Sequence, residues 1–183
     1  MFKHVDINDK EVWENTLEKW PEEALALGDE GVFLSLDIQT KLNCLKQQVE
    51  KEKNFHCYFL VKTGNIYASS LLEISHALPK AEDSWVKLLN ITLQPSLLPM
   101  SSGISAENFR EAVNVLAYSI THAISLIFEE HRAKILKIYL RTNEMEELAK
   151  ALISTGKLEM TAESYQLTAR LEGRWLIIER IKP

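Results

Sequence analysis

The sequence predicts an α/β (α+β) fold, a three-layer sandwich in which a mixed, mostly antiparallel sheet of about six to seven strands carries helices on both faces. Three observations predict this class. Apolar residues recur every three or four positions before residue 53 and again over 106–131, which is helical spacing. They alternate from Asn54 to Gln94, which is strand spacing. Gly, Pro and Asn residues separate these stretches.

Length and composition fit one domain. The chain has 183 residues, of which 46% are hydrophobic and 26% charged, and these ordinary values exclude collagen and intrinsic disorder. We therefore expect a single domain over 1–183. Within it, residues 1–53 form an N-terminal strand and helices, and residues 54–183 form the sheet, a long helix and a C-terminal hairpin.

The N-terminal part is expected to begin with a short strand and continue as three helical segments. Asn8 or Asp9 can cap the first helix, because either side chain accepts hydrogen bonds from first-turn amides. Its apolar face consists of Val12, Trp13, Thr16, Leu17 and Trp20. Pro21 is expected to open a second short turn of helix that stops at Gly28. Ser35 is expected to start the third segment, whose buried stripe consists of Ile38, Leu42, Leu45 and Val49.

The middle of the chain is expected to form three strands. Alternating apolar residues predict a hairpin of Phe55–Val61 and Ile66–Ile74 that turns at Thr63–Asn65. A third strand is expected over Trp85–Gln94. It ends before Pro95, since proline cannot donate a hydrogen bond to a central ladder.

The C-terminal part begins with the longest helix, over Ala106–His131. Its apolar stripe consists of Phe109, Val113, Leu116, Ile120, Ala123, Ile124, Ile127 and Phe128. A strand over Lys134–Arg141 and a helix from Asn143 to Gly156 are expected to follow. A final hairpin, 165–171 with 175–181, is expected to turn at Glu172–Gly173.

Charge is unevenly distributed along the chain. Residues 1–53 carry 12 acidic and 7 basic side chains, a net charge of −5, whereas residues 54–183 carry 14 of each. No basic stripe with interleaved aromatic residues is present, so a nucleic-acid partner is disfavoured. No apolar run reaches the roughly 20 residues of a membrane span, and the start of the chain lacks the apolar core of a signal peptide. We therefore expect a cytoplasmic protein without a membrane partner.

The cysteines and histidines predict neither disulfides nor a metal site. Two cysteines are too few for a disulfide framework, and we expect both as reduced thiols. Cys57 alternates with Phe55 and Phe59, which is typical of a buried thiol. The five histidines show no spacing suited to zinc, so no metal is expected.

Two segments, together with the order of the elements, resemble the GCN5-related N-acetyltransferase (GNAT) superfamily. The first runs from Leu89 to Pro95 and is followed by Gly103-Ile104-Ser105 at the start of the long helix. It is similar to a degenerate form of the family's pyrophosphate loop, in which the first glycine is missing and Ser105 replaces the last. The second is the strand 137–142, which ends at Asn143 and leads into a helix.

The resemblance implies an N-acyltransferase that moves an acetyl group from acetyl-CoA or another acyl-CoA to a small-molecule or peptide amine. The amine attacks the thioester directly, and the main-chain amide near Leu93 polarises its carbonyl. The donor-binding residues it implies are Leu93, Gln94, Ser102, Gly103, Ile104, Ser105 and Asn143. Arg141 lies at a strand end and can bind an anion in place of the missing loop arginine. A salt bridge to Glu144 or Glu147 is the alternative for Arg141.

Several alternatives stay open at this point. A catalytically silent GNAT-like module for ligand sensing or protein interaction, and an acyltransferase with a long-chain or carrier-protein-bound donor, share the same fold. Ser105 is either a phosphate ligand or simply the cap of the long helix. Glu73 is either a weak candidate for a catalytic base or an exposed strand residue. The sequence also leaves a homodimer open.

Overall fold

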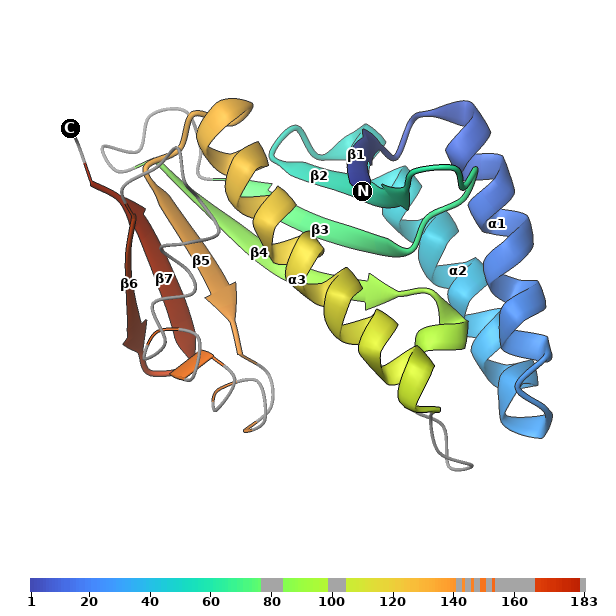
Figure 1. Ribbon diagram of the computed structural model, residues 1–183. Coiled ribbons are helices and arrows are strands. Elements are labelled where there is room, and N and C mark those ends of the chain that lie inside the picture. Colours follow the sequence, from blue (N-terminus) through green and yellow to red (C-terminus); the bar gives the residue numbers. More distant parts are fainter. Residues whose placement is uncertain are drawn as a thin grey trace. The chain divides into compact units, whose positions relative to one another are not determined.

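The computed structural model describes residues 1–76, 84–98, 105–140 and 167–181, together with positions 143, 146, 149, 150 and 153. Its strands form one seven-stranded sheet in the order β1-β2-β3-β4-β5-β7-β6, as Figure 1 shows. The strands are β1 Phe2–Asp6, β2 Phe55–Lys62, β3 Ser70–His76, β4 Trp85–Leu93, β5 Ile135–Tyr139, β6 Leu167–Glu172 and β7 Trp175–Arg180. The helices are α1 Lys10–Leu25, α2 Asp29–Lys51 and α3 Ala106–Glu129, with a short 3₁₀ helix, η1, over Pro95–Leu97. This mixed, mostly antiparallel α+β architecture confirms the predicted fold class.

The chain divides into two compact units, which are described separately. The first comprises Met1–Glu73 with Asn90–Ile120, and the second comprises Ile74–Leu89 with Thr121–Pro183. None of the helices in the described part of the chain has the length and apolar character that a membrane span requires.

Helix α1 of the first unit begins as predicted but ends later than predicted. The Asp9 side chain caps it by accepting a hydrogen bond from the Val12 amide at 3.1 Å, as expected. However, α1 continues through Pro21 instead of restarting there. Trp20 and Ala24 on either side of the proline are fully buried, and this packing offsets the hydrogen bond that proline removes.

Helix α2 starts six residues earlier than predicted. It follows Gly28, whose φ of 89° lets the chain turn between the two helices. Asp29 and Glu30 then occupy its first turn, where acidic side chains stabilise the helix dipole. Ser35 is therefore a buried residue inside α2 and not its start.

The strand after the β2 turn starts later than predicted, at Ser70 instead of Ile66. The Ala68 backbone is held by α1: its carbonyl accepts from Trp20 Nε1 at 2.7 Å, and its amide donates to Thr16 Oγ1 at 3.0 Å. Because both backbone groups of Ala68 are bonded to α1, they are not available to β2. Pairing with β2 resumes at the Ser69 amide, which donates to the Leu60 carbonyl at 2.8 Å.

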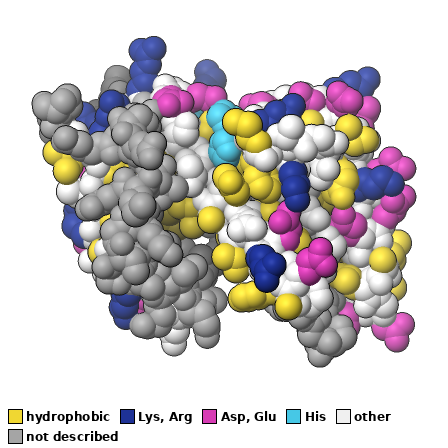
Figure 2. Space-filling view, viewed as in Figure 1, with side chains coloured by type: hydrophobic (Ala, Val, Ile, Leu, Met, Phe, Trp, Pro, Cys, Tyr) yellow, Lys and Arg dark blue, Asp and Glu magenta, His cyan; other side chains and the backbone are white. Residues whose placement is uncertain are grey.

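Helix α3 lies against the face of β3 opposite to Glu73 in the first unit. Ser119 and Ser70 share a buried hydrogen bond of 2.7 Å between their hydroxyls. The predicted apolar stripe is wrong in this half of the helix, because Phe109 is 60% and Val113 48% exposed. Ala112, Val115 and Ser119 form the buried face of this half instead, so the face is turned away from the predicted stripe. Figure 2 shows hydrophobic side chains among charged ones over α3.

The second unit contains the parallel pair and the C-terminal hairpin. Strand β4 pairs with β5 in parallel, from Trp85↔Ile135 to Leu88↔Ile138. Strands β6 and β7 form the predicted hairpin, with Gly173 at a φ of 59° in its turn. The second unit also contains the C-terminal part of α3. There Ala123, Ile124 and Ile127 are buried as predicted, whereas the Phe128 side chain lies outside the described residues. The described positions 143, 146, 149, 150 and 153 are helical, as expected, and Gly156 lies outside the described residues.

Candidate functional site

The C-terminal end of β4 presents backbone amides at one edge. Its described ladder with β5 ends at Leu88, yet the strand continues to Leu93. On the β3 side, the Gln94 amide donates to the Ser69 carbonyl at 3.0 Å. Successive amides of a strand point to opposite edges, so the amides of Leu93 and Ile91 point away from β3. The edge that they occupy is the one where the β5 ladder has already ended.

Ser105 is the N-cap of α3. Its hydroxyl accepts a hydrogen bond from the Asn108 amide at 3.1 Å, and its carbonyl accepts from Phe109 at 2.9 Å. Of the two predicted roles of Ser105, the cap is therefore present. The first amides of any helix lack an acceptor within it, so this end of α3 keeps donors for an anion. Ser102, Gly103 and Ile104, predicted to precede it, lie outside the described residues.

Gln94 forms hydrogen bonds within the segment that follows β4. Its side-chain Nε2 donates to Ser96 Oγ at 2.9 Å, and its carbonyl accepts from Leu97 at 3.0 Å. The Ser96 amide in turn donates to Glu23 of α1 at 3.3 Å, and the Ser96 carbonyl accepts from Asn108 of α3 at 3.1 Å. These bonds fix η1 between the end of β4 and the start of α3. The side chain of Gln94 thus has a structural partner in place of a ligand.

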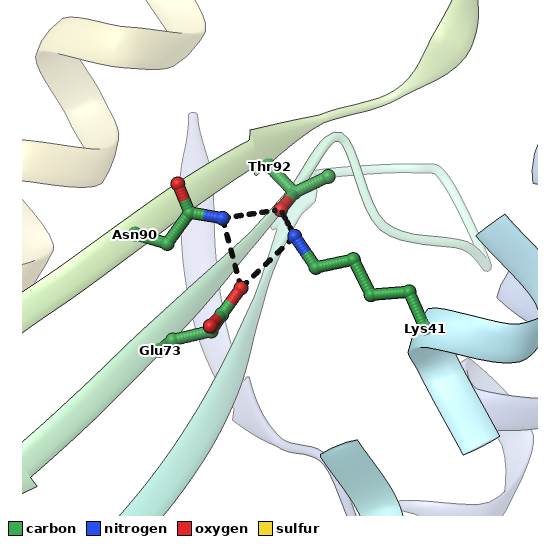
Figure 3. Close-up of polar contacts among 4 residues, drawn as sticks. All are labelled: Lys41, Glu73, Asn90 and Thr92. Atoms are coloured by element: carbon green, nitrogen blue, oxygen red, sulfur yellow. Dashed lines mark hydrogen bonds and ion pairs between the residues drawn. The ribbon is translucent and has the colours of Figure 1, made fainter. Parts of the chain in front are cut away.

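Glu73 lies in a polar cluster formed by α2, β3 and β4 (Figure 3). Its Oε1 atom lies 3.0 Å from Lys41 Nζ and accepts from Asn90 Nδ2 at 2.9 Å. Lys41 also donates to Thr92 Oγ1 at 2.7 Å, and Asn90 lies 3.2 Å from the same oxygen. The Glu73 side chain is only 13% exposed. It is therefore a partly buried, ion-paired carboxylate and not the exposed strand residue of the alternative.

The cluster combines a carboxylate with donors that hold one of its oxygens in place. Both bonds that Glu73 receives from described residues end on Oε1, which leaves Oε2 to accept a proton or a hydrogen bond. Thr92 precedes Leu93, so the cluster is one residue from an edge amide of β4. Sequence reasoning identified Glu73 but missed Lys41, Asn90 and Thr92. The only signal for Asn90 and Thr92 was their shared strand face at a two-residue spacing.

Cys57 of β2 confirms the predicted buried thiol. It is 1% exposed, and burial raises the pKa of its thiol well above the usual range, with a further increase from the charge of Glu73. A thiol held in its neutral form is a poor nucleophile. Cys57 therefore belongs to the core beside the polar cluster and not to the chemistry.

In the second unit, the structure describes Asn143 but not Arg141, which lies outside the described residues. Asn143 is exposed, and its Oδ1 accepts from Arg174 Nη2 at 3.4 Å. The rings of His76 and His131 lie 5.7 Å apart in the same unit. The histidine spacing gave no sign of this contact, because the two residues come from the ends of different elements.

Comparisons with known proteins identify the fold. No family model matches the chain, and no curated protein matches its sequence. A mutant of the toxin AtaT, bound to acetyl-CoA and the C-terminus of the antitoxin AtaR, is 14% identical with a TM-score of 0.51, over 96% of this chain and 91% of that chain. AtaT complexed with acetyl-methionyl-tRNAfMet is 12% identical with a TM-score of 0.49, over 98% of this chain and 95% of that chain. A putative GNAT-family acetyltransferase from Desulfovibrio desulfuricans is 12% identical with a TM-score of 0.41, over 100% of this chain and 99% of that chain.

The chain therefore has the fold of the GNAT acetyltransferases. The resemblance found in the sequence is confirmed at this level. The low identity marks a divergent example of the fold and shows the fold alone.

Proposed function

We propose that the protein is an acyl-CoA-dependent N-acyltransferase that transfers an acetyl group to an amine. The observation that carries the proposal is the edge of β4, where the amides of Ile91 and Leu93 point away from β3 beyond the end of the β5 ladder. An extended pantetheine arm carries amide groups that can hydrogen-bond to such an edge, as an added strand does. The relative AtaT, which shares the fold, binds acetyl-CoA.

In this proposal the Leu93 amide donates to the thioester carbonyl. Oxygen of that carbonyl becomes negatively charged as the amine attacks, and a fixed N–H donor stabilises the charge more in the transition state than in the ground state. The Leu93 amide suits this role because its neighbour, the Gln94 amide, is bound to Ser69 and fixes the local backbone. In this proposal backbone groups hold the acyl donor in place, and this positioning supplies much of the rate.

The phosphates of the donor are proposed to lie at the start of α3. Ser105 keeps the helix end in place there, and the first-turn amides after it supply donors to an anion. Ser102, Gly103 and Ile104 complete this part of the proposal as residues of the loop before the cap. Arg141 and Asn143, which the sequence analysis suggested, are proposed as further ligands of the donor phosphates.

The reaction is a direct transfer. The amine nitrogen forms a bond to the carbonyl carbon of the thioester, the carbon–sulfur bond breaks, and the coenzyme leaves as its thiolate. The amine must lose one proton, and we assign this proton to Oε2 of Glu73, since the bonds from described residues end on Oε1. Lys41 and Asn90 position the carboxylate through Oε1. The acceptor is proposed to be a small-molecule or peptide amine, in a cytoplasmic setting that suits two reduced cysteines.

Calorimetric titration and thermal unfolding with acetyl-CoA test the proposal. At a hundredfold excess over its dissociation constant, a donor that binds only the folded chain stabilises it by about 2.7 kcal/mol. Stabilisation by acetyl-CoA but not by free acetate supports the proposal. No effect of any acyl-CoA would leave the silent binding module as the function. An effect of long-chain or carrier-bound donors alone would favour the larger donor.

A further inference from the structure

The corner between α1 and α2 exposes a group of large apolar side chains. Phe33 is 79% exposed, Leu36 is 60% and Val32 is 48% exposed, all on the first half of α2. Residues three and four positions apart share a helix face, so these three side chains adjoin. Leu25, the last residue of α1, is 52% exposed. We refer to Leu25, Val32, Phe33 and Leu36 as the corner surface.

Gly31 allows the backbones of α1 and α2 to meet closely at this corner. A Cβ atom at this position would lie 1.8 Å from the Ala24 carbonyl oxygen and 3.3 Å from the Leu25 Cα. The first turn of α2 therefore lies directly against the end of α1. The corner surface therefore spans the end of α1 and the first half of α2.

The charged side chains of the first half of α2, beside the corner surface, are all acidic. From Trp20 to Thr40 the chain carries five acidic residues and no Lys, Arg or His, and of these five Glu22 pairs with Lys19 of α1. Three of the acidic residues are exposed on α2 within four positions of Phe33, namely Asp29, Glu30 and Asp37. Exposed apolar groups with a rim of a single charge are typical of a protein-binding surface whose partner carries the opposite charge.

We propose that the corner surface docks a cationic amphipathic helix of a partner protein. Apolar side chains of that helix, spaced three and four residues apart, contact Phe33 and Leu36, while its Lys and Arg residues face Asp29 and Asp37. A second copy of this chain fits poorly, because its own corner surface carries the same acidic rim. An anionic membrane surface is repelled for the same reason.

Fluorescence anisotropy with a labelled peptide tests the proposal on the full-length chain. The probe is a peptide of leucine and lysine, about five helical turns long, with its leucines at positions spaced by three and four. We expect saturable binding that weakens with added salt. The Phe33→Ala/Leu36→Ala variant should weaken binding by about tenfold or more, since anchors at interfaces carry most of the affinity. Asp29→Lys/Asp37→Lys should weaken binding and flatten its salt dependence.

Phe109→Ala is the matched control, because Phe109 is a similarly exposed phenylalanine on α3. It should bind the peptide as the unaltered chain does. Equal binding by the Phe33→Ala/Leu36→Ala variant would overturn the proposal, as would equal binding of a peptide with glutamate in place of lysine. Self-association in sedimentation that Phe33→Ala abolishes would also overturn it, by showing that a second copy covers the surface.

Discussion

Lys41 of α2 and Glu73 of β3 form an ion pair, with 3.0 Å between Nζ and Oε1. Their side chains are 34% and 13% exposed, so water screens the pair only in part. The same lysine donates to Thr92 on β4. One side chain of α2 thus joins two neighbouring strands of the sheet, and the pair has a role in stability as well as a proposed role in catalysis.

Removing the lysine should destabilise the fold. Lys41→Met leaves the Glu73 carboxylate partly buried without its cation, which we expect to cost about 1–2 kcal/mol after allowance for the exposure of Lys41. Urea denaturation measures the change, and Lys41→Met/Glu73→Gln should recover part of it in a double-mutant cycle. Lys19→Met is the control, because its pair with Glu22 is exposed. A loss no larger than that of the control would contradict the role of the pair.

Neutralising the carboxylate should reduce turnover more than stability. Glu73→Gln keeps an oxygen for the Asn90 hydrogen bond but cannot take up the amine proton, so kcat with acetyl-CoA and an amine should fall about 10²–10⁴-fold. The control is Glu111→Gln, which removes an acidic partner of Lys62 at 2.6 Å, away from the cluster. Unchanged kcat in Glu73→Gln would remove Glu73 from the mechanism and leave positioning as the source of catalysis.

The backbone of Leu93 can be altered without breaking the sheet. Leu93→Pro removes an N–H that points away from β3, so it costs no ladder bond on that side. We expect kcat to fall about 10²–10³-fold, the range seen when one oxyanion donor is lost. Leu93→Ala keeps the N–H and serves as the control for the side chain. Similar activity in the two variants would show that the amide is not a donor to the thioester.

The two thiols should differ in reactivity and in their effect on stability. A thiol reagent should modify exposed Cys44 in the folded chain and Cys57 only after unfolding. Because folding raises the pKa of Cys57, its stabilising contribution is complete below the unfolded thiol pKa of about 8.5 and is lost as the pH rises above that value. Cys57→Ala should reduce the decline of the unfolding free energy above this pH. Equal reaction of both thiols in the folded chain would contradict the burial of Cys57.

Element types were predictable from the sequence, whereas several boundaries were not. Alternation and helical spacing identified the strands and the long helix, whereas the parallel pairing of β4 with β5 is a finding of the structure. The start of α2 was missed because Ser35 resembles a cap, although Gly28 and the acidic residues after it mark the true start. The late start of β3 depends on two tertiary hydrogen bonds of Ala68, whose carbonyl accepts from Trp20 and whose amide donates to Thr16. No local pattern contains that information.

The site was predictable only in part, for a similar reason. The position of Leu93 at the end of a strand follows from Pro95 after it, and the cap at Ser105 follows from its residue type. The ion pair of Glu73 does not follow from any local pattern, because Lys41 belongs to a helix that is distant in the sequence. The exposure of Phe109 and Val113 was missed because the buried face of this half of α3 runs through Ala112, Val115 and Ser119, and the apolar pattern offered both faces.

Amide hydrogen exchange at Leu93, followed by NMR with and without saturating acetyl-CoA, tests the central claim most directly. The Gln94 amide, which is already bound to Ser69, is the internal reference. The account predicts that acetyl-CoA slows exchange at Leu93 and leaves Gln94 unchanged. Bound acetyl-CoA with unaltered exchange at Leu93 would contradict the claim that the edge of β4 beyond its described ladder with β5 receives the thioester.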